Sequence, residues 1–315
     1  MIFYASGAIV DRTTLELVVR HRIAILTSFA YKNAFRKQMP ILAPMLRECG
    51  WKMPYMLDSG AFTAWNKGKN VRMEVLIDFY NQAVDEYGDC LDLTCISLDR
   101  IPGRQGVERT PQDFLDAAKE TVENYEYMVK KVRAPLKPVY HDGEPRWVLD
   151  AYEGAKYVGL SANQDQSYAY REAWVKKVEP WFPGKQLHGL AMTGTRMLRT
   201  IRWYSVDSAA WVLWAAMGAI ALLRDDGSLK IMACSKESPQ RKNRDKHITT
   251  LPVVVQERLR AELAEEGMTF ESIAEEGLAR SRWNILVFHK ACEWAASNDV
   301  VAARLVQGMT HGLFD

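Results

Sequence analysis

Residues Trp203–Trp211 read WYSVDSAAW and place a carboxylate between two apolar runs. The run Ile201–Val206 predicts a strand that stops at Asp207, and Trp211–Leu223 predicts a buried helix. Enzymes built from alternating strands and helices keep reactive groups at the carboxyl ends of their strands. Aspartate is also a favoured residue at a helix N-cap. Two interpretations of Asp207 therefore stay open, a reactive carboxylate and a helix cap.

The order of strands and helices along the chain predicts the fold class. Eight short apolar runs alternate with helical segments, which indicates parallel βα units. Eight such units in about 250 residues are the pattern of an α/β protein with a (β/α)₈ TIM barrel. A doubly wound open sheet is the competing fold, but no glycine-rich dinucleotide fingerprint supports it. The predicted strands begin at Ile23, Pro54, Leu91, Leu136, Lys156, Gln186, Ile201 and Leu229.

The last quarter of the chain predicts helices only. We expect a TIM-barrel domain over residues 1–250 and a small C-terminal extension of helices, residues 251–315, packed on the barrel. The expected helical segments there are 252–266, 270–279, 283–296 and 300–307.

Composition and charge exclude several classes of protein. The net charge is only +2, so any attraction to nucleic acid must come from local patches. Five cysteines at irregular spacing form no C-x-x-C pair, which argues against a structural zinc site and for a reduced, cytoplasmic chain (host cytoplasm if the gene is a phage's). The N-terminus lacks the basic region of a secretion signal. The longest apolar run, Ala209–Leu223, is too short to favour a membrane span.

Polar side chains follow most of the predicted strands. In a barrel these strand ends converge on one mouth, so the side chains are expected to face one cavity. Three carboxylates in one pocket raise each other's pKa and are costly without a chemical task. No set with metal-ligand spacing stands out, whereas a nucleophile with an acid/base carboxylate is the pattern of glycosyl transfer. The residues are Asp58, Asp99, His141, Asn163, Thr193 and Asp207.

Five short motifs, taken in order, resemble those of tRNA-guanine transglycosylases. The segment MLDSGAF, residues 56–62, resembles the family's D-S-G-G-[FY] motif. The segment SLD (97–99) resembles its base-recognition aspartate, and VGLS (158–161) resembles its glycine-leucine segment beside the base. HGLAM (188–192) resembles the strand that forms one wall of the base pocket. SVDS, residues 205–208, stands where the family's nucleophilic aspartate belongs.

One departure from that family concerns zinc. The tRNA enzymes carry a C-x-C-x-x-C…H site after the nucleophile, where this chain has only Cys234 and His247. Two ligands cannot complete a four-ligand site. The S-V-D-S form and the missing zinc motif are more similar to the DpdA-type branch, phage and bacterial enzymes that insert 7-deazaguanines into DNA. The resemblance therefore implies DNA as the polymer, with no metal and no cofactor.

The resemblance also implies roles for individual residues. Asp207 would be the nucleophile that attacks C1′, and Asp58 the acid/base that protonates the leaving guanine. Asp99 would accept hydrogen bonds from N1–H and the exocyclic amine of the base. The remaining residues expected to bind the base are Ser59, Gly60, Phe62, His141, Gly159, Leu160, Leu190 and Met192. For Phe62, Leu190 and Met192, plain core packing is the competing interpretation.

Two basic stretches are candidates for phosphate contacts. The run Lys236–Lys246 follows the last predicted strand and would lie at the barrel mouth. A target base in duplex DNA would have to be flipped out, or the enzyme would act on single strands. The expected partners are thus DNA and a free 7-deazaguanine base, with no membrane, and a homodimer is left open. The candidate DNA contacts are Lys236, Arg241, Lys242, Arg244, Lys246, Arg100 and Arg104.

Three other functions compete with DNA-guanine exchange. One is a tRNA-guanine transglycosylase that has lost its zinc. Another is a base glycosidase on the same barrel, which would pass the sugar to water. The third is a DNA-binding barrel subunit without catalysis.

Overall fold

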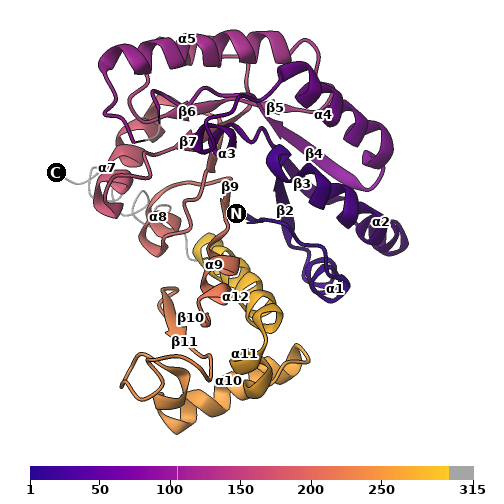
Figure 1. Cartoon of the computed structure of the whole chain (residues 1–315), viewed down its shortest axis with the longest axis vertical. Helices are drawn as coiled ribbons and strands as arrows, with labels where there is room; N and C mark the ends of the chain where they lie inside the picture. Colours follow the sequence, from indigo (N-terminus) through magenta and orange to yellow (C-terminus); the bar gives the residue numbers. More distant parts are fainter. Residues whose placement is uncertain (105, 298–315) are drawn as a thin grey trace, which may run out of the picture.

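The computed structural model describes residues 1–104 and 106–297, in which nine parallel strands form one nearly closed barrel (Figure 1). The strands lie in the order β5-β4-β3-β2-β1-β9-β8-β7-β6, and each pairs with its neighbours in parallel. Their bounds are β1 Ile2–Ser6, β2 Ala24–Ser28, β3 Met53–Asp58, β4 Leu91–Ile96, β5 Leu136–Lys137, β6 Val139–His141, β7 Tyr157–Ser161, β8 Gln186–Gly189 and β9 Ser205–Ser208. This confirms the predicted TIM-barrel fold.

The barrel closes through a segment that Pro138 divides in two. β5 pairs with β4, and β6 pairs with β7. Proline has no N–H to contribute to a ladder, so it separates the two short strands. Its carbonyl still accepts the N–H of Gly159 at 2.8 Å, which ties the two sides together. The segment 136–141 therefore occupies the position of one barrel strand. The nine strands thus fill the eight strand positions of a TIM barrel.

Helices alternate with the strands and cover the outside of the barrel (Figure 1). The local sequence explains where several begin. Asp11 caps the first helix by accepting the N–H of Thr14, and Thr110 with Asp113 forms a capping box before Pro111. The bounds are α1 Arg12–Arg20, α2 Lys32–Cys49, α3 Ala61–Asn66, α4 Met73–Tyr87, α5 Pro111–Met128, α6 Val148–Ala151, α7 Tyr168–Val178 and α8 Thr195–Thr200.

Alternation along the strands separates two apolar layers. One buried cluster fills the barrel interior and includes Tyr4, Leu26 and Met56. A much larger cluster lies between the strands and the helices and takes the intervening residues, such as Phe3 and Leu57. Successive side chains of a strand point to opposite faces, so every second residue faces the barrel axis. The polar residues that reach the mouth lie on this inward face.

Two of the predicted elements are wrong. β1 was not predicted, and Leu229–Ala233 was predicted as the eighth barrel strand, whereas this run is β11 of a separate antiparallel hairpin with β10, Ala219–Leu223. The predicted helix Trp211–Leu223 ends early, because α9 covers Ala210–Ala216 and Gly218 turns the chain at φ +72°. A short apolar run fits a strand as well as a buried helix, so periodicity alone does not distinguish them.

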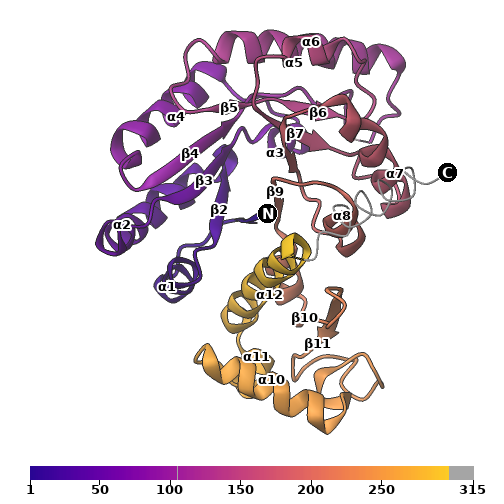
Figure 2. The same cartoon turned by 180° about the vertical axis from the view of Figure 1, so that it is seen from behind.

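The remaining helices lie beyond β9 (Figure 2). They are α10 Val253–Glu265, α11 Phe270–Glu275 and α12 Gly277–Ser297. α12 returns to the barrel, where Phe288 stacks on Phe3 with ring centroids 6.0 Å apart. It therefore takes the place of the last barrel helix, with the hairpin, α10 and α11 inserted before it. The predicted helix at 300–307 lies outside the described residues. No helix within the described ranges is long and apolar enough to cross a membrane.

Candidate active site

Three aspartates meet at the carboxyl ends of the strands. Asp58 closes β3, Asp99 follows β4, and Asp207 lies inside β9. The hydroxyl of Ser59 donates to Asp99 Oδ1 at 3.1 Å, and His141 Nε2 lies 2.9 Å from Asp99 Oδ2. The structure therefore brings together the carboxylates that the sequence analysis assigned to one pocket.

Asp207 does not act as a helix cap. Residue Ala209 stands at the N-cap of α9, and no side chain caps that helix. The Oδ1 atom of Asp207 instead accepts the backbone N–H of Ala191 at 2.9 Å. The alternative of a pure capping role, which the sequence left open, is therefore excluded.

Asp58 stands in an environment that favours its protonated form. Burial raises the pKa of Asp58 to about 6, and the negative charges of Asp99 and Asp207 contribute to the rise. Hydrogen bonds from Ser28 and from the N–H of Gly60, the latter at 3.0 Å, act in the opposite direction. A carboxyl group with a pKa near neutrality can both give and take a proton, as a general acid and base must.

Glycine is required at the third position of the Asp58-Ser59-Gly60 turn. Gly60 has φ +76°, and a Cβ there would lie 2.9 Å from the backbone nitrogen of Ala30. Only glycine adopts this conformation without strain and allows that close approach. The turn aims the Gly60 N–H back at Asp58 and leaves Ser59 to contact Asp99.

A buried imidazole joins Asp99 to a second carboxylate that the sequence analysis missed. His141 Nδ1 lies 3.1 Å from Glu144 Oε1, and the His141 backbone N–H donates to Glu144 Oε2 at 2.8 Å. Burial lowers the pKa of His141, but the charges and hydrogen bonds of Glu144 and Asp99 outweigh it and raise the pKa to about 10. His141 is therefore an imidazolium that lies between the carboxyl groups of Asp99 and Glu144. Glu144 follows His141 by three residues, and this spacing alone does not indicate a contact between the two side chains.

This ion triad predicts a specific pH dependence of stability. The pKa of His141 rises from 6.5 to about 10 on folding, so its contribution is complete below pH 6.5 and is lost as the pH passes through 10. We expect His141→Gln to cost about 3–5 kcal/mol at pH 6, because it breaks a buried pair. The difference in unfolding free energy from the wild type, measured in urea, should shrink between pH 7 and pH 10.5. A difference that stays constant over this range would contradict the assignment.

A second buried polar group lies beneath Asp207, on the inward faces of β5, β7, β8 and β9. His188 is fully buried, its Nδ1 lies 2.6 Å from Ser205 Oγ, and Ser205 in turn contacts the Tyr157 hydroxyl. Lys137 Nζ lies 4.6 Å from the centre of the Tyr157 ring. Burial holds the pKa of Lys137 well below its usual range, and burial lowers the pKa of His188 to about 4, with the charge of Lys137 acting in the same direction.

These buried groups were not predicted from the sequence, for two different reasons. His188 interrupts an apolar run, QLHGLAM, and this was the one available signal. Lys137 gave none, because a lysine near a strand end is normally exposed.

Only some of the residues predicted to bind the base are positioned to do so. Phe62 is 53% exposed and stacks on Trp65, so it is available to a ligand at the mouth. Gly159 was expected to bind the base, but its N–H donates to the Pro138 carbonyl inside the sheet and is not available to a ligand. Met192 is buried in the layer between strands and helices, which is the packing alternative.

The other two apolar residues predicted to bind the base, Leu160 and Leu190, belong to different apolar layers. The Leu160 side chain belongs to the outer layer and faces the helices. Leu190 packs against the interior cluster. A Cβ on Gly159 would lie 2.8 Å from Leu190, so the glycine makes room for that side chain.

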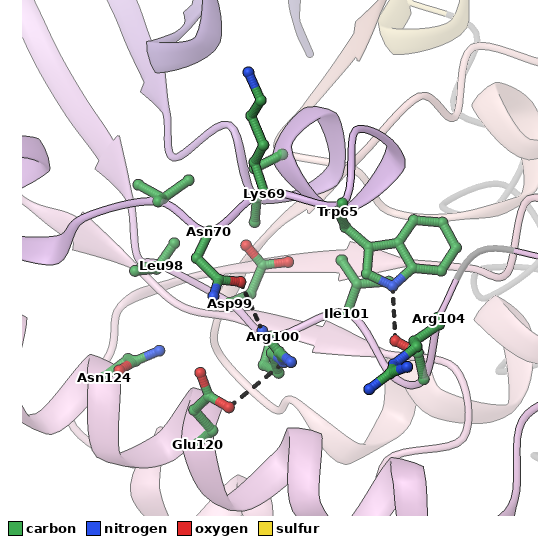
Figure 3. Close-up of a pocket in the computed structure, with 15 residues that line it drawn as sticks. Trp65, Lys69, Asn70, Leu98, Asp99, Arg100, Ile101, Arg104, Glu120 and Asn124 are labelled. Atoms are coloured by element: carbon green, nitrogen blue, oxygen red, sulfur yellow. Dashed lines mark hydrogen bonds and ion pairs between the residues drawn. The ribbon is translucent and has the colours of Figure 1, made fainter.

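Two cavities open at this end of the barrel. A small one of about 90 Å³ lies between Phe62, His141, Ser161 and Asn163. A larger one of about 730 Å³ extends sideways from Asp99, between Trp65, Lys69 and Asn70 on one side and Glu120 and Asn124 of α5 on the other (Figure 3). Asp58 and Asp207 do not line the larger cavity. The larger cavity therefore opens beside Asp99, and the other two aspartates lie outside its lining.

The two basic stretches fall in different places. Arg100 and Arg104 line the larger cavity, where Arg100 also contacts Asn70 at 3.3 Å and Glu120 at 3.5 Å (Figure 3). The run Lys236–Lys246 follows β11 of the outlying hairpin, not a barrel strand. The run was predicted to lie at the barrel mouth because it follows the last predicted strand. That strand is not part of the barrel, so the reason is wrong. The residues concerned are Lys236, Arg241, Lys242, Arg244 and Lys246.

The residues in the zinc-motif region serve packing. Cys234 is buried, and its thiol points at the carbonyls of Gly218 and Ile273, at 3.4 and 3.3 Å. His247 contacts Thr249 through Nδ1. Among the described residues, no cluster of three or more histidine, cysteine or acidic side chains could hold a metal ion.

Comparisons with known proteins give a likeness of shape alone. Neither a family model nor a curated protein matches this chain. Three solved structures resemble it with a TM-score of 0.41 each. N-acetylneuraminate lyase from Mycoplasma synoviae is 10% identical over 68% of this chain and 74% of its own, and a putative dihydrodipicolinate synthetase from Pseudomonas aeruginosa is 9% identical over 66% and 70%. The tryptophan synthase α2β2 complex from Pyrococcus furiosus is 10% identical over 69% and 90%. Likeness at this level says nothing of what this chain acts on.

Proposed function

We propose that this protein is an enzyme that exchanges guanine in DNA for a free 7-deazaguanine base through a covalent link to Asp207. The observation that carries the proposal is the division of three nearby carboxylates into three environments. Asp207 is held by a backbone N–H, Asp58 has a pKa raised to about 6, and Asp99 is paired with an imidazolium. A nucleophile, an acid/base and a fixed acceptor for base N–H groups are the parts that glycosyl exchange requires.

The exchange would proceed in two displacements. Asp207 attacks C1′ of the target nucleoside, and the base leaves with the electron pair of the C1′–N bond and a proton from Asp58. The incoming base then loses its N9 proton to Asp58 and attacks C1′, which frees Asp207. Two inversions at C1′ give net retention.

Asp99 would select the base. Each of its oxygens already accepts one contact, from Ser59 and from His141, and a carboxylate oxygen can accept a second. Guanine and its 7-deaza analogues present N1–H and an exocyclic amine side by side, which match two adjacent oxygens. Adenine lacks this donor pair and would leave a buried carboxylate unpaired.

The choice of DNA as the polymer rests on the SVDS motif and on the residues that stand in place of the zinc site. Cys234 and His247 are engaged in packing, and this supports the zinc-less branch of the resemblance. Arg100 and Arg104, beside Asp99, would contact phosphates of the strand that carries the target.

Labelled guanine tests the function, since exchange of guanine for guanine does not depend on which deazaguanine is used. We expect the purified protein to incorporate the label into genomic DNA and not into bulk tRNA, with single-stranded DNA at least as good as duplex. Exchange only in tRNA would overturn the choice of polymer. Release of guanine without any need for free base would indicate a glycosidase, and DNA binding without exchange or release would indicate the non-catalytic alternative.

A further inference from the structure

Two nitrogen atoms lie close to the same oxygen of Asp207. The Ala191 N–H donates to Oδ1 at 2.9 Å, and His188 Nε2 lies 3.3 Å from the same atom. The Asp207 side chain keeps 11% of its surface exposed. The carboxylate is therefore held by one oxygen and presents the other.

The first of these donors is aimed by a strained backbone. Ala191 has φ +54°, a left-handed conformation that residues with a Cβ rarely adopt. The residue lies two positions after the end of β8, where the chain must turn for its N–H to point at β9. Strain of this kind persists where the surrounding structure holds it and is typical of functional sites.

The second donor is set by a chain of buried contacts. His188 Nδ1 lies 2.6 Å from Ser205 Oγ, and Ser205 Oγ contacts the hydroxyl of Tyr157. If Nδ1 carried the proton, the lone pair of Nε2 would face the Asp207 carboxylate. The favourable arrangement has Ser205 donating to Nδ1 and the proton on Nε2, which faces Asp207. The rings of Tyr4 and Tyr157 pack edge-on around the imidazole, with centroids 5.9 and 6.2 Å away, and fix its plane.

The Nε2 atom is close to Asp207 but poorly aligned with it. It is fully buried, and at 3.3 Å its geometry is not that of a hydrogen bond, so it is a polar atom without a partner in the resting protein. Such a group carries a desolvation cost unless another state of the site uses it. A small rotation of the carboxylate would align the two.

We propose, on the basis of the transglycosylase function above, that Asp207 attacks through Oδ2 and that Oδ1 stays in a two-donor cradle made by the Ala191 N–H and His188 Nε2–H. In the first displacement, an electron pair of Oδ2 forms the bond to C1′ while the C1′–N pair leaves with the base. Oδ1 becomes the carbonyl oxygen of the glycosyl ester. In the second displacement, the C1′–Oδ2 pair returns to Asp207, and the negative charge that reappears on the carboxylate is shared with Oδ1 and its two donors. His188 is thus a positioning residue for the nucleophile.

The cradle affects the two displacements differently. Donors on Oδ1 withdraw charge from the carboxylate, so they do little for the attack by Oδ2. They stabilise the carboxylate as a leaving group, in the manner of donors aimed at a developing oxyanion. Loss of the His188 donor should therefore slow the second displacement more than the first and allow the covalent intermediate to accumulate.

A pair of variants separates this role from simple packing. His188→Leu removes the donor and keeps the bulk, whereas His188→Gln retains an N–H close to the position of Nε2. We expect His188→Leu to slow labelled-guanine exchange about 10²-fold and to raise the fraction of protein cross-linked to DNA in an SDS-quenched reaction. His188→Gln should recover at least tenfold of the lost rate and return the cross-linked fraction toward the wild-type value. Melting temperatures of both variants show whether each is folded.

The outcomes keep the cradle and the proposed function apart. Equal losses in the two folded variants, with the cross-linked fraction unchanged, overturn the cradle while wild-type exchange upholds the function. If the wild type shows no exchange on DNA or tRNA, the function fails and this role for His188 fails with it.

A second measurement needs no activity. Nitrogen-15 chemical shifts of histidine-labelled protein at pH 7, with the His188→Gln variant for assignment, should show Nε2 protonated and Nδ1 unprotonated. The opposite tautomer overturns the cradle.

Discussion

Replacing Asp207 with asparagine is expected to abolish guanine exchange, with a loss of at least about 10⁴-fold, because an amide cannot form the glycosyl ester. The amide oxygen can still accept the Ala191 N–H, so the strand end keeps its geometry. The melting temperature should be unchanged or higher, since the variant removes one of three negative charges that raise each other's free energy. Labelled-guanine exchange and SDS-stable cross-linking to DNA both measure the effect.

A matched substitution at the other end of the barrel provides the control. Asp92 is exposed in β4, within the first two residues of that strand, and so lies away from the mouth. Asp92→Asn changes the net charge by the same amount and should leave exchange within about twofold, as surface substitutions rarely act at a distance. Exchange that survives in Asp207→Asn would refute the assignment of Asp207 as the nucleophile.

The strands that enclose the site could be predicted because each ends in polar residues after an apolar run. Asp58, Asp99 and Asp207 were found in this way, and the structure brings them together. The error at the last strand has a physical cause. The run Leu229–Ala233 has the composition of a barrel strand but buries only one of its five residues deeply, since it belongs to a hairpin that is covered on one side. Residue types alone do not show that one side of such a hairpin is exposed.

The prediction of one long helix after Asp207 was wrong for a related reason. The segments Trp211–Ala216 and Ala219–Leu223 are both apolar and are separated by Gly218, where the chain turns. A sequence pattern gives the burial of both segments but not their separation into α9 and β10. The strand β1 was missed because a short run at the very start of the chain has no preceding helix to mark it.

The polar network beneath Asp207 lies beyond sequence reasoning because it depends on register. His188 and Ser205 are partners across β8 and β9, and this pairing alone brings Nδ1 to the serine hydroxyl. The same holds for Lys137, which lies beside Tyr157 because the segment 136–141 runs next to β7 in register. Residues 17 and 20 positions apart in the sequence give no signal of contact until the sheet is assembled. Parts of the site that require one residue at one strand end were therefore predicted, and parts that require two strands in register were not.

The second large effect is expected at Asp99, on the choice of base. A site built to accept hydrogen bonds from a substrate N–H discriminates by about 10⁴–10⁵ against an analogue that lacks the group. Hypoxanthine retains N1–H and lacks the exocyclic amine of guanine, so it tests one of the two bonds that Asp99 would accept. In the wild type we expect guanine to outcompete hypoxanthine by at least about 10³-fold in exchange.

Asp99→Asn should slow guanine exchange about 10³-fold or more and reduce the preference over hypoxanthine at least tenfold. The amide keeps the size of the side chain but presents one acceptor in place of two, and its NH₂ group faces the donors of the base. Ser59→Ala is the comparison variant, because it removes only the contact to Oδ1 and leaves His141 in place. It should cost about tenfold in rate with little change in preference, as expected for one hydrogen bond to a charged group.

The comparison distinguishes base recognition from a structural role for the triad. If Asp99 only anchors His141, then Asp99→Asn should lower the melting temperature and reduce exchange of both bases equally. A guanine preference that is unchanged in a folded Asp99→Asn protein would therefore exclude Asp99 as the base-reading residue, without affecting the assignment of Asp207. The preference ratio isolates recognition, because changes in the amount of folded enzyme cancel between two bases that compete in one reaction.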